Sequence, residues 1–178
     1  MIEGILRESI DKQEVKGLRR DGYLIANIYG RGAENIHCAF KRNEFMKFVK
    51  NKPSLKFKVK VADTVCEVII QDYQKDPVSS ELLHVDLRIL NYGETATFLV
   101  PVKTKGTPIG LKNKGVLVMS KRRVKVKCKP ENLPDSITID IATLDVGDTV
   151  LVRQVTPMEG VIIKHPDSDA VVGVMKAK

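Results

Sequence analysis

The sequence predicts a mainly β protein, and two stretches show the pattern best. At 55–61 every odd residue is apolar and every even residue is lysine. Residues 123–129 repeat the alternation, with two valines and a cysteine set between basic residues. Because successive side chains of a strand point to opposite faces, each stretch would bury one face and leave its bases in solvent. Helical periodicity is rare by comparison.

Further runs of the same kind complete the expected strands. They span residues 2–10, 24–29, 35–40, 65–73, 83–90, 95–103, 136–141, 149–155 and 171–174. Two short helices are expected between them. Residues 43–49 form an amphipathic turn with Asn43 as the expected N-cap, and residues 14–20 would form a basic helix that ends near Gly22.

The chain has 178 residues, enough for two small domains. Residues 91–94 have the composition of a short connection between two strand-like runs, and both sides keep enough valine, isoleucine and leucine for a core. The sequence therefore predicts one domain at 1–91 and a second at 92–178. Their formal net charges are +3 and +5.

Basic residues are concentrated in two places. Residues 95–130 contain ten bases and no acid, and residues 41–60 contain eight bases and one acid. The whole chain has a formal net charge of +8. Many small proteins are mildly basic, but such concentrated charge favours a polyanionic partner such as nucleic acid.

Several classes of function find no support. The sequence contains no P-loop, dinucleotide-binding, zinc-protease or nucleophile-elbow motif. Its three cysteines, Cys38, Cys66 and Cys128, have no CxxC partners, which suits a reducing compartment. No apolar run approaches the roughly 18–20 residues of a membrane helix, and the N-terminus lacks the features of a secretory signal. His84 and Asp86 share a strand face, but no further metal ligand is in view.

A series of short motifs resembles one family over nearly the whole chain. In the first half they are ANIYG at 26–30, IQDYQKDP at 70–77 and LHVDL at 83–87. In the second half they are VPV at 100–102, KGTP at 105–108, Gly110, GVL at 115–117, CKP at 128–130, LPDSI at 133–137, Asp140 and LDVGD at 144–148. Their order is similar to that of the bacterial large-subunit ribosomal protein twenty-five family, also called the Ctc or general stress protein family, in its two-domain form.

The resemblance implies a six-stranded β-barrel with short helices, followed by a C-terminal mainly β domain. It implies a structural protein of the large (50S) ribosomal subunit that binds the loop E region of 5S rRNA and supports the central protuberance during translation. Magnesium would be present at the interface through the RNA, and the protein would need no cofactor of its own. Neighbouring ribosomal proteins and 23S rRNA are further expected partners, through the C-terminal domain. We expect a cytoplasmic protein without membrane association that is a monomer off the ribosome.

The family's RNA-contact positions fall on polar and basic residues of the first domain. They are Arg7, Lys16, Tyr29, Gln71, Gln74, His84 and Asp86, to which the basic helix adds Arg19 and Arg20. Polar side chains on a sheet suit the wide, shallow minor groove of A-form RNA, and cations suit its phosphates. Gln71 and Gln74 lie three apart, so the strand must bend for both to face the RNA. Two positions depart from the family: Lys16 stands in place of the usual arginine, and Ile25 replaces a proline.

Three other functions fit parts of the pattern. A related barrel binds the tRNA anticodon in glutaminyl-tRNA synthetase, but this chain has no synthetase catalytic domain. A stress-induced protein-interaction module would present its basic face to an acidic partner. An RNA-processing hydrolase could use His84 and Asp86, but the sequence shows no nucleophile–base pair or metal constellation for it. Binding that weakens steeply with salt would favour an RNA partner.

Overall fold

The computed structural model describes residues 1–7, 11–52, 54–156 and 158–177. The chain divides into two compact units, Met1–Asn91 and Tyr92–Lys178. The first unit is a closed barrel, and the second contains a four-stranded and a three-stranded sheet. The predicted mainly β class is therefore confirmed. That each half folds on its own stays a prediction.

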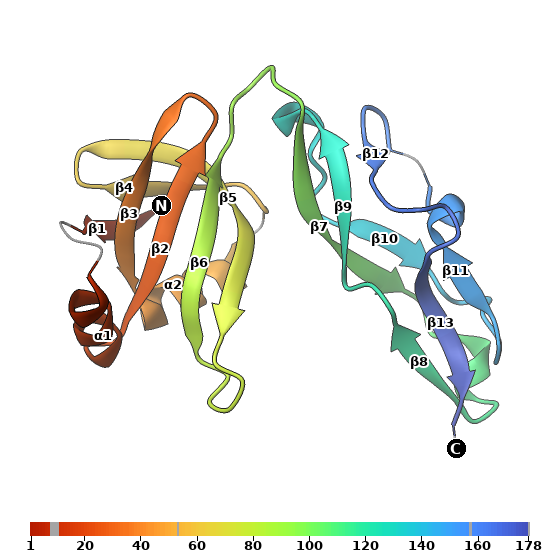
Figure 1. Ribbon diagram of the computed structural model, residues 1–178. Helices are drawn as coiled ribbons and strands as arrows, with labels where there is room; N and C mark the ends of the chain where they lie inside the picture. Colours follow the sequence, from red (N-terminus) through yellow and green to blue (C-terminus); the bar gives the residue numbers. More distant parts are fainter. Residues whose placement is uncertain (8–10, 53, 157, 178) are drawn as a thin grey trace. The chain divides into compact units, whose positions relative to one another are not determined.

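The barrel of the first unit has six strands and two helices (Figure 1). They are β1 (Ile2–Leu6), α1 (Lys12–Arg20), β2 (Tyr23–Gly30), β3 (Ala33–Lys41), α2 (Arg42–Asn51), β4 (Phe57–Val61), β5 (Thr64–Lys75) and β6 (Leu82–Ile89). The order around the barrel is β1-β3-β2-β6-β5-β4, and a parallel pairing of β1 with β4 closes it. Closure leaves none of the six strands as an open edge. The six-stranded barrel that the resemblance implies is thus confirmed.

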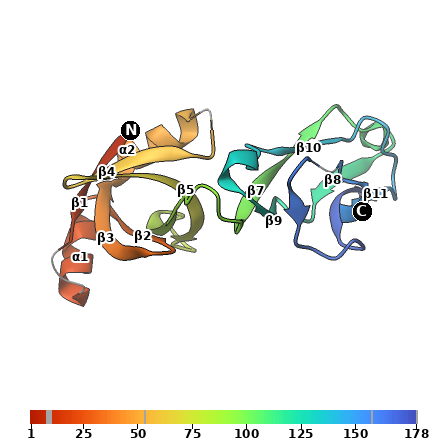
Figure 2. The ribbon, with the colours of Figure 1, turned by 90° about the horizontal axis from the view of Figure 1, so that it is seen from above.

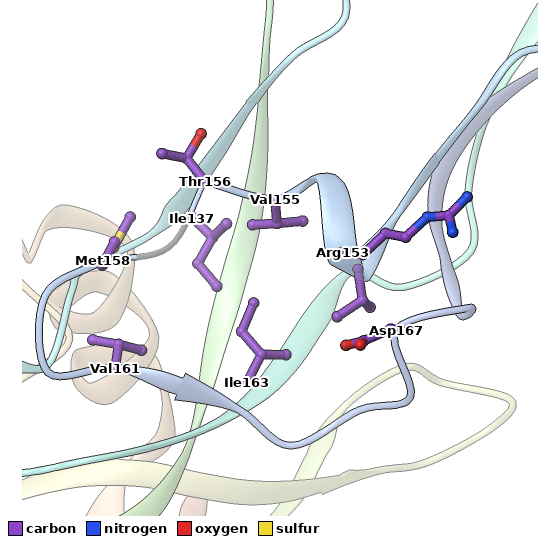
Figure 3. Close-up of a pocket in the computed structure, with 9 residues that line it drawn as sticks. Ile137, Arg153, Val155, Thr156, Met158, Val161, Ile163 and Asp167 are labelled. Carbon is purple, nitrogen blue, oxygen red and sulfur yellow. The ribbon is translucent and has the colours of Figure 1, made fainter.

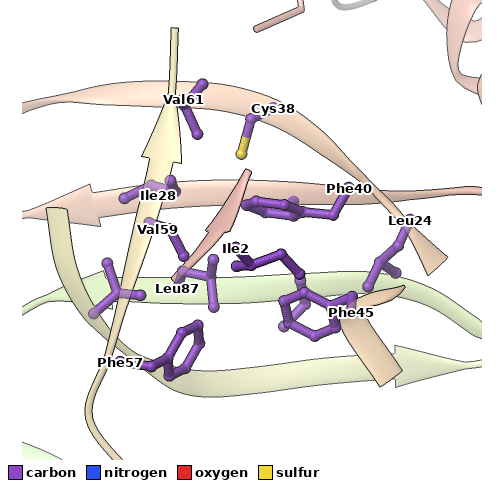
Figure 4. Close-up of a cluster of buried hydrophobic side chains, with 13 residues drawn as sticks. Ile2, Leu24, Ile28, Cys38, Phe40, Phe45, Phe57, Val59, Val61 and Leu87 are labelled. Atoms are coloured by element: carbon purple, nitrogen blue, oxygen red, sulfur yellow. The ribbon is translucent and has the colours of Figure 1, made fainter. Parts of the chain in front are cut away.

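Alternating side chains fill the barrel interior (Figure 4). On β4, Phe57 and Val59 are buried, while Lys58 between them is exposed, as the sequence pattern predicts. Helix α2 adds Phe45, whose ring centroid lies 5.4 Å from that of Phe40 and 6.5 Å from that of Phe57. Full burial of such a side chain stabilises the fold by roughly 1.5–3 kcal/mol.

Several element boundaries in this unit differ from expectation, among them one each in β1, α1 and α2. The first strand ends at Leu6 instead of residue 10, and residues 8–10 lie outside the described residues. Helix α1 begins at Lys12, two residues earlier than predicted. Helix α2 begins at Arg42 with Lys41 as N-cap, so the expected Asn43 cap is wrong. The Arg42 backbone N–H donates to the Gly22 carbonyl at 3.0 Å, which turns the chain before Asn43 is reached.

The second unit is built on two small sheets (Figures 1 and 2). Its elements are β7 (Ala96–Lys105), η1 (Ile109–Leu111), β8 (Gly115–Met119), β9 (Arg123–Cys128), η2 (Pro130–Asn132), β10 (Ile137–Asp140), β11 (Thr149–Leu151), η3 (Val152–Gln154), β12 (Ile162–Ile163) and β13 (Ala170–Lys176). One sheet has the order β10-β7-β9-β12, and the other has the order β11-β13-β8. The second alternating stretch forms β9, which buries Val124, Val126 and Cys128.

Strands β8 and β12 are not among the expected elements, and the expected strand at 149–155 is too long. It ends at Leu151, whose backbone N–H donates a hydrogen bond to Gln154 Oε1 at 2.8 Å, and the chain turns into η3. Strand β12 has only two residues, and its pairing with β9 places Ile162 opposite Lys127. So short a strand depends on its distant partner and has no period of its own.

Candidate nucleic-acid interface

Strand pairing brings several predicted residues onto one outer face of the barrel. Strands β2 and β6 run parallel, with Asn27 opposite Asp86 and Tyr29 opposite Arg88. Paired residues of neighbouring strands point to the same side of a sheet. The intervening side chains of β6 belong to the barrel core, so these four point outward.

A β-bulge in β5 puts both predicted glutamines on this face. The register with β6 shifts between Ile70 and Asp72. Ile70 and Tyr73 both pack against the core, so Gln71 and Asp72 between them lie together on the outer side. Gln74 follows on the same side. The bend that the glutamine spacing requires is therefore present, at the bulge.

Strand β3 extends the same surface. His37 is opposite Asn27, and its Nδ1 lies 2.9 Å from Asn27 Oδ1. We call the complete set the polar face: Asn27, Tyr29, His37, Gln71, Asp72, Gln74, His84, Asp86 and Arg88. One row of it, His37, Asn27, Asp86 and Asp72, crosses all four strands.

His84 lies among charges but is itself mostly uncharged. Its Nδ1 is 3.7 Å from Asp86 Oδ1, too far for a hydrogen bond, and this nitrogen is buried. Burial lowers the pKa of His84 below its usual 6.5; Asp86 raises it, whereas Arg19 and Arg7 lower it further. Burial and the two arginines together outweigh the single carboxylate. A neutral imidazole offers one donor and one acceptor to a ligand.

Tyr29 and Gln71 provide further hydrogen-bonding groups. Burial raises the pKa of Tyr29 above 10, and Asp86 and Asp72 raise it as well, against an opposing effect of Arg88. The hydroxyl therefore stays protonated and can both donate and accept. Gln71 Oε1 is buried and has no hydrogen-bond partner among the residues described. Leaving a buried acceptor unsatisfied costs about 1–3 kcal/mol, so a donor from a ligand would be favourable there.

Helix α1 places cations beside the polar face. Arg19 Nη2 donates to the Leu83 carbonyl at 3.3 Å, which fixes the helix next to His84. Lys16 and Arg20 are exposed on the same helix. Arg19 thus lies beside the polar face, and Lys16 and Arg20 belong to the same helix but not to the strands of the face.

Arg7 differs from the other predicted cations. It is only 8% exposed, and its Nη2 lies 3.8 Å from Glu14 Oε2. A phosphate contact by Arg7 would require this pair to open. Its RNA contact stays a prediction, and in the structure its guanidinium faces Glu14 and not solvent.

Four members of the polar face are absent from the predicted set. They are Asn27, His37, Asp72 and Arg88. Asn27 and Arg88 could have been predicted, because each lies two residues along the same strand from a predicted residue, Tyr29 or Asp86. The other two depend on the pairing of β3 with β2 and on the bulge, for which the sequence has no local signal.

The described residues include no cluster of metal ligands, and they line several pockets besides the polar face. None of the groups of His, Cys, Asp and Glu in these ranges has three members placed to hold a metal ion. The second unit has a pocket of about 250 Å³ with a mainly aliphatic wall, where Arg153 and Asp167 lie at one end (Figure 3).

The helices of the structure are short or polar. In the part of the chain that the structure describes, no helix has both the length and the apolar character to cross a bilayer.

The first unit is thus a β-barrel with a polar sheet face and a basic helix beside it, followed by a second β unit. Comparison with known families matches both units. The model of the ribosomal L25p family matches residues 2–87, and that of the ribosomal protein TL5 C-terminal domain matches residues 95–178. The chain belongs to the ribosomal L25p family.

Individual relatives match over their whole length. The large ribosomal subunit protein bL25 of Wolinella succinogenes is 58% identical over 178 residues, which is all of both chains. The proteins of the same name from Helicobacter pylori strain J99 and Campylobacter lari are 54% and 57% identical, again over all of both chains. The predicted family is confirmed. The chain is accordingly a structural protein of the bacterial large ribosomal subunit, cytoplasmic and not an enzyme.

Proposed function

We propose that this large-subunit protein binds 5S rRNA at the loop E region through the polar face, and in this way supports the central protuberance during translation. The observation that carries the proposal is the convergence of Tyr29, Gln71, Gln74, His84 and Asp86 on one outer surface of the barrel. These residues are up to 57 positions apart in the sequence, and only strand pairing brings them together.

The polar face carries the hydrogen-bonding groups that an RNA minor groove requires. Neutral His84, the Tyr29 hydroxyl and the Gln71 amide each combine donor and acceptor capacity. An RNA minor groove presents 2′-hydroxyls and base edges that need both. Neighbouring strands are about 4.8 Å apart, and alternate residues along a strand are about 6.8 Å apart, so the groups form a regular grid.

The two aspartates of the polar face favour contact with the groove of the RNA over contact with its phosphate backbone. Asp72 and Asp86 can accept from a 2′-hydroxyl or an exocyclic amine, whereas they repel phosphates. Phosphate contacts therefore fall to the exposed Lys16 and Arg20 of α1, at the side of the face. Magnesium ions carried by the RNA would reduce repulsion at the carboxylates.

The test compares two RNAs with magnesium present: 5S rRNA containing loop E, and a regular RNA duplex of the same length. The wild-type protein should prefer 5S rRNA. Tyr29→Phe and His84→Ala should each reduce this preference by roughly 1–3 kcal/mol, the cost of a lost base contact in DNA recognition. Both variants should keep the wild-type circular dichroism spectrum.

Lys58→Ala provides the matched control, because Lys58 is exposed on β4, outside the polar face. It should leave the preference unchanged. Equal affinity of the wild-type protein for both RNAs would contradict the proposal.

A further inference from the structure

The outer face of the four-stranded sheet in the second unit collects bases from two strands. Strands β7 and β9 are antiparallel, with Leu99 opposite Lys125 and Pro101 opposite Arg123. The residues between these positions are buried, so the paired residues point outward. Continuing along each strand in steps of two gives the set that we call the basic face: Lys103, Lys105, Arg123, Lys125 and Lys127.

Little negative charge opposes the basic face. Strand β10 adds Asp140 opposite Lys105. The Asp140 carboxylate is turned to its own chain, where Oδ1 accepts a hydrogen bond from the Ala142 backbone N–H at 2.9 Å. Among the residues described, no ion pair joins a carboxylate to any of the four lysines of the basic face. The lysine ammonium groups are therefore available to a partner.

The surface between the lysines is poor in large apolar groups. Thr97 and Thr138 lie on the same side, and Leu99 and Pro101 are half-buried. The exception is Ile162 of β12, which is 60% exposed at the rim. Protein interfaces are depleted in lysine and have an apolar centre, whereas this face has lysines on two adjacent strands and only half-buried Leu99 and Pro101 between them.

We infer that the basic face binds the sugar–phosphate backbone of RNA within the large subunit. Since four of its five cations are exposed lysines, it would give attraction with little sequence selection. The inference rests on membership of a large-subunit ribosomal family and on the geometry of the second unit. It does not depend on recognition of loop E by the first unit.

The experiment uses the full chain and a regular RNA duplex as probe, with affinity measured over a series of salt concentrations. Lys125→Gln combined with Lys127→Gln should weaken binding. The slope of log K against log salt should fall by about 1.4–1.8, which corresponds to two lost phosphate contacts. Lys112→Gln combined with Lys176→Gln removes the same charge from exposed positions outside the basic face and should change the slope little.

Loop E RNA separates this inference from the proposed function. The basic-face variant should lose affinity for 5S rRNA and for the duplex by the same factor, which leaves the ratio between them unchanged. Tyr29→Phe should change that ratio instead. An unchanged salt slope in the basic-face variant, together with a changed ratio in Tyr29→Phe, would contradict the basic face while leaving the proposed function intact.

Two further outcomes would overturn the inference. If both lysine pairs lower the slope equally, net charge and not the basic face governs binding. If the basic-face variant binds naked RNA normally yet fails to join large subunits that lack the protein, the face binds an acidic protein.

Discussion

Asp72 of β5 and Asp86 of β6 are directly opposite each other on antiparallel strands, so two carboxylates stand side by side on the polar face. Asp72 Oδ1 accepts a hydrogen bond from the Tyr73 backbone N–H at 2.8 Å, and Asp86 Oδ1 lies 3.7 Å from His84 Nδ1. Like charges at opposed positions destabilise a sheet. The barrel therefore carries a repulsive pair at the place where we propose that RNA binds.

Asp72→Asn should stabilise the protein without RNA. The change removes the repulsion, and the asparagine oxygen can still accept from Tyr73. We expect the free energy of unfolding to rise by roughly 0.2–1 kcal/mol in urea titrations at low salt, with a smaller gain at high salt. Asp63→Asn, in the exposed turn between β4 and β5, is the control and should give no such gain. A gain that is the same for both variants would mean that the paired position is not special.

His84 should make the barrel less stable as the pH falls. Its pKa in the folded state is below 6.5, so the unfolded chain binds the proton first. The stabilisation from neutral His84 is thus complete above the unfolded pKa and is lost as the pH falls through the folded pKa. Thermal unfolding between about pH 5.5 and 7.5 should show a smaller loss of stability for His84→Gln than for the wild-type protein. His37→Gln leaves His84 in place and should keep the wild-type dependence.

Two glycine substitutions should have opposite effects. A Cβ at Gly4 in β1 would lie 2.5 Å from Phe40 Cε1, so Gly4→Ala should lower the free energy of unfolding by about 1–3 kcal/mol through overpacking. Gly17 in α1 has nothing within 4 Å of the added methyl group. Gly17→Ala should raise stability by up to about 1 kcal/mol, because glycine is a poor helix former. Urea denaturation measures both, and a stabilising Gly4→Ala would contradict the packing of Phe40.

The cysteines should differ in reactivity. Burial raises the pKa of Cys38 to about 12, and burial also raises the pKa of the less buried Cys66. Since the thiolate is the nucleophile, native protein treated with iodoacetamide should be modified at Cys66 well before Cys38. Mass spectrometry of the peptides gives the order. In denaturant both should react at similar rates, and equal rates in the native protein would contradict the burial of Cys38.

A core truncation should test the independence of the two halves. Leu87 is completely buried in the barrel, so Leu87→Ala should cost about 2–5 kcal/mol in the first unit. Hydrogen exchange should quicken in β2 and β6, while amides of β9 in the second unit stay protected. Equal loss of protection in both units would show that the two halves unfold together.

Local pattern was a good guide wherever one strand face meets a core. The lysine alternation at 55–61 and 123–129 predicts β4 and β9 because buried and exposed positions differ in every second residue. The order of short motifs then identified the barrel and placed Tyr29, Gln71 and His84 in one site, which no period within a single strand could do.

Features that depend on residues far apart in the sequence have no local pattern that predicts them. Arg7 is buried where it faces Glu14 of α1. From the sequence alone, a basic residue at the end of a strand is expected at the surface. The membership of His37 and Asp72 in the polar face follows from strand register. The predicted N-cap at Asn43 is wrong because α2 already begins at Arg42, whose backbone N–H donates to the Gly22 carbonyl.

β6 is the last strand of the barrel to leave the ribosome during synthesis, and it lies between β2 and β5. Its parallel partner β2 must wait for it, since Ile25 pairs with His84. Pairings between such distant segments form slowly, and a domain made on the ribosome folds as a unit once its chain is complete. A nascent chain that stops before Leu82 therefore has most of its bases but no assembled polar face. If the polar face binds RNA as we propose, selective binding would begin only when the barrel closes, and unfinished copies would not compete with finished ones.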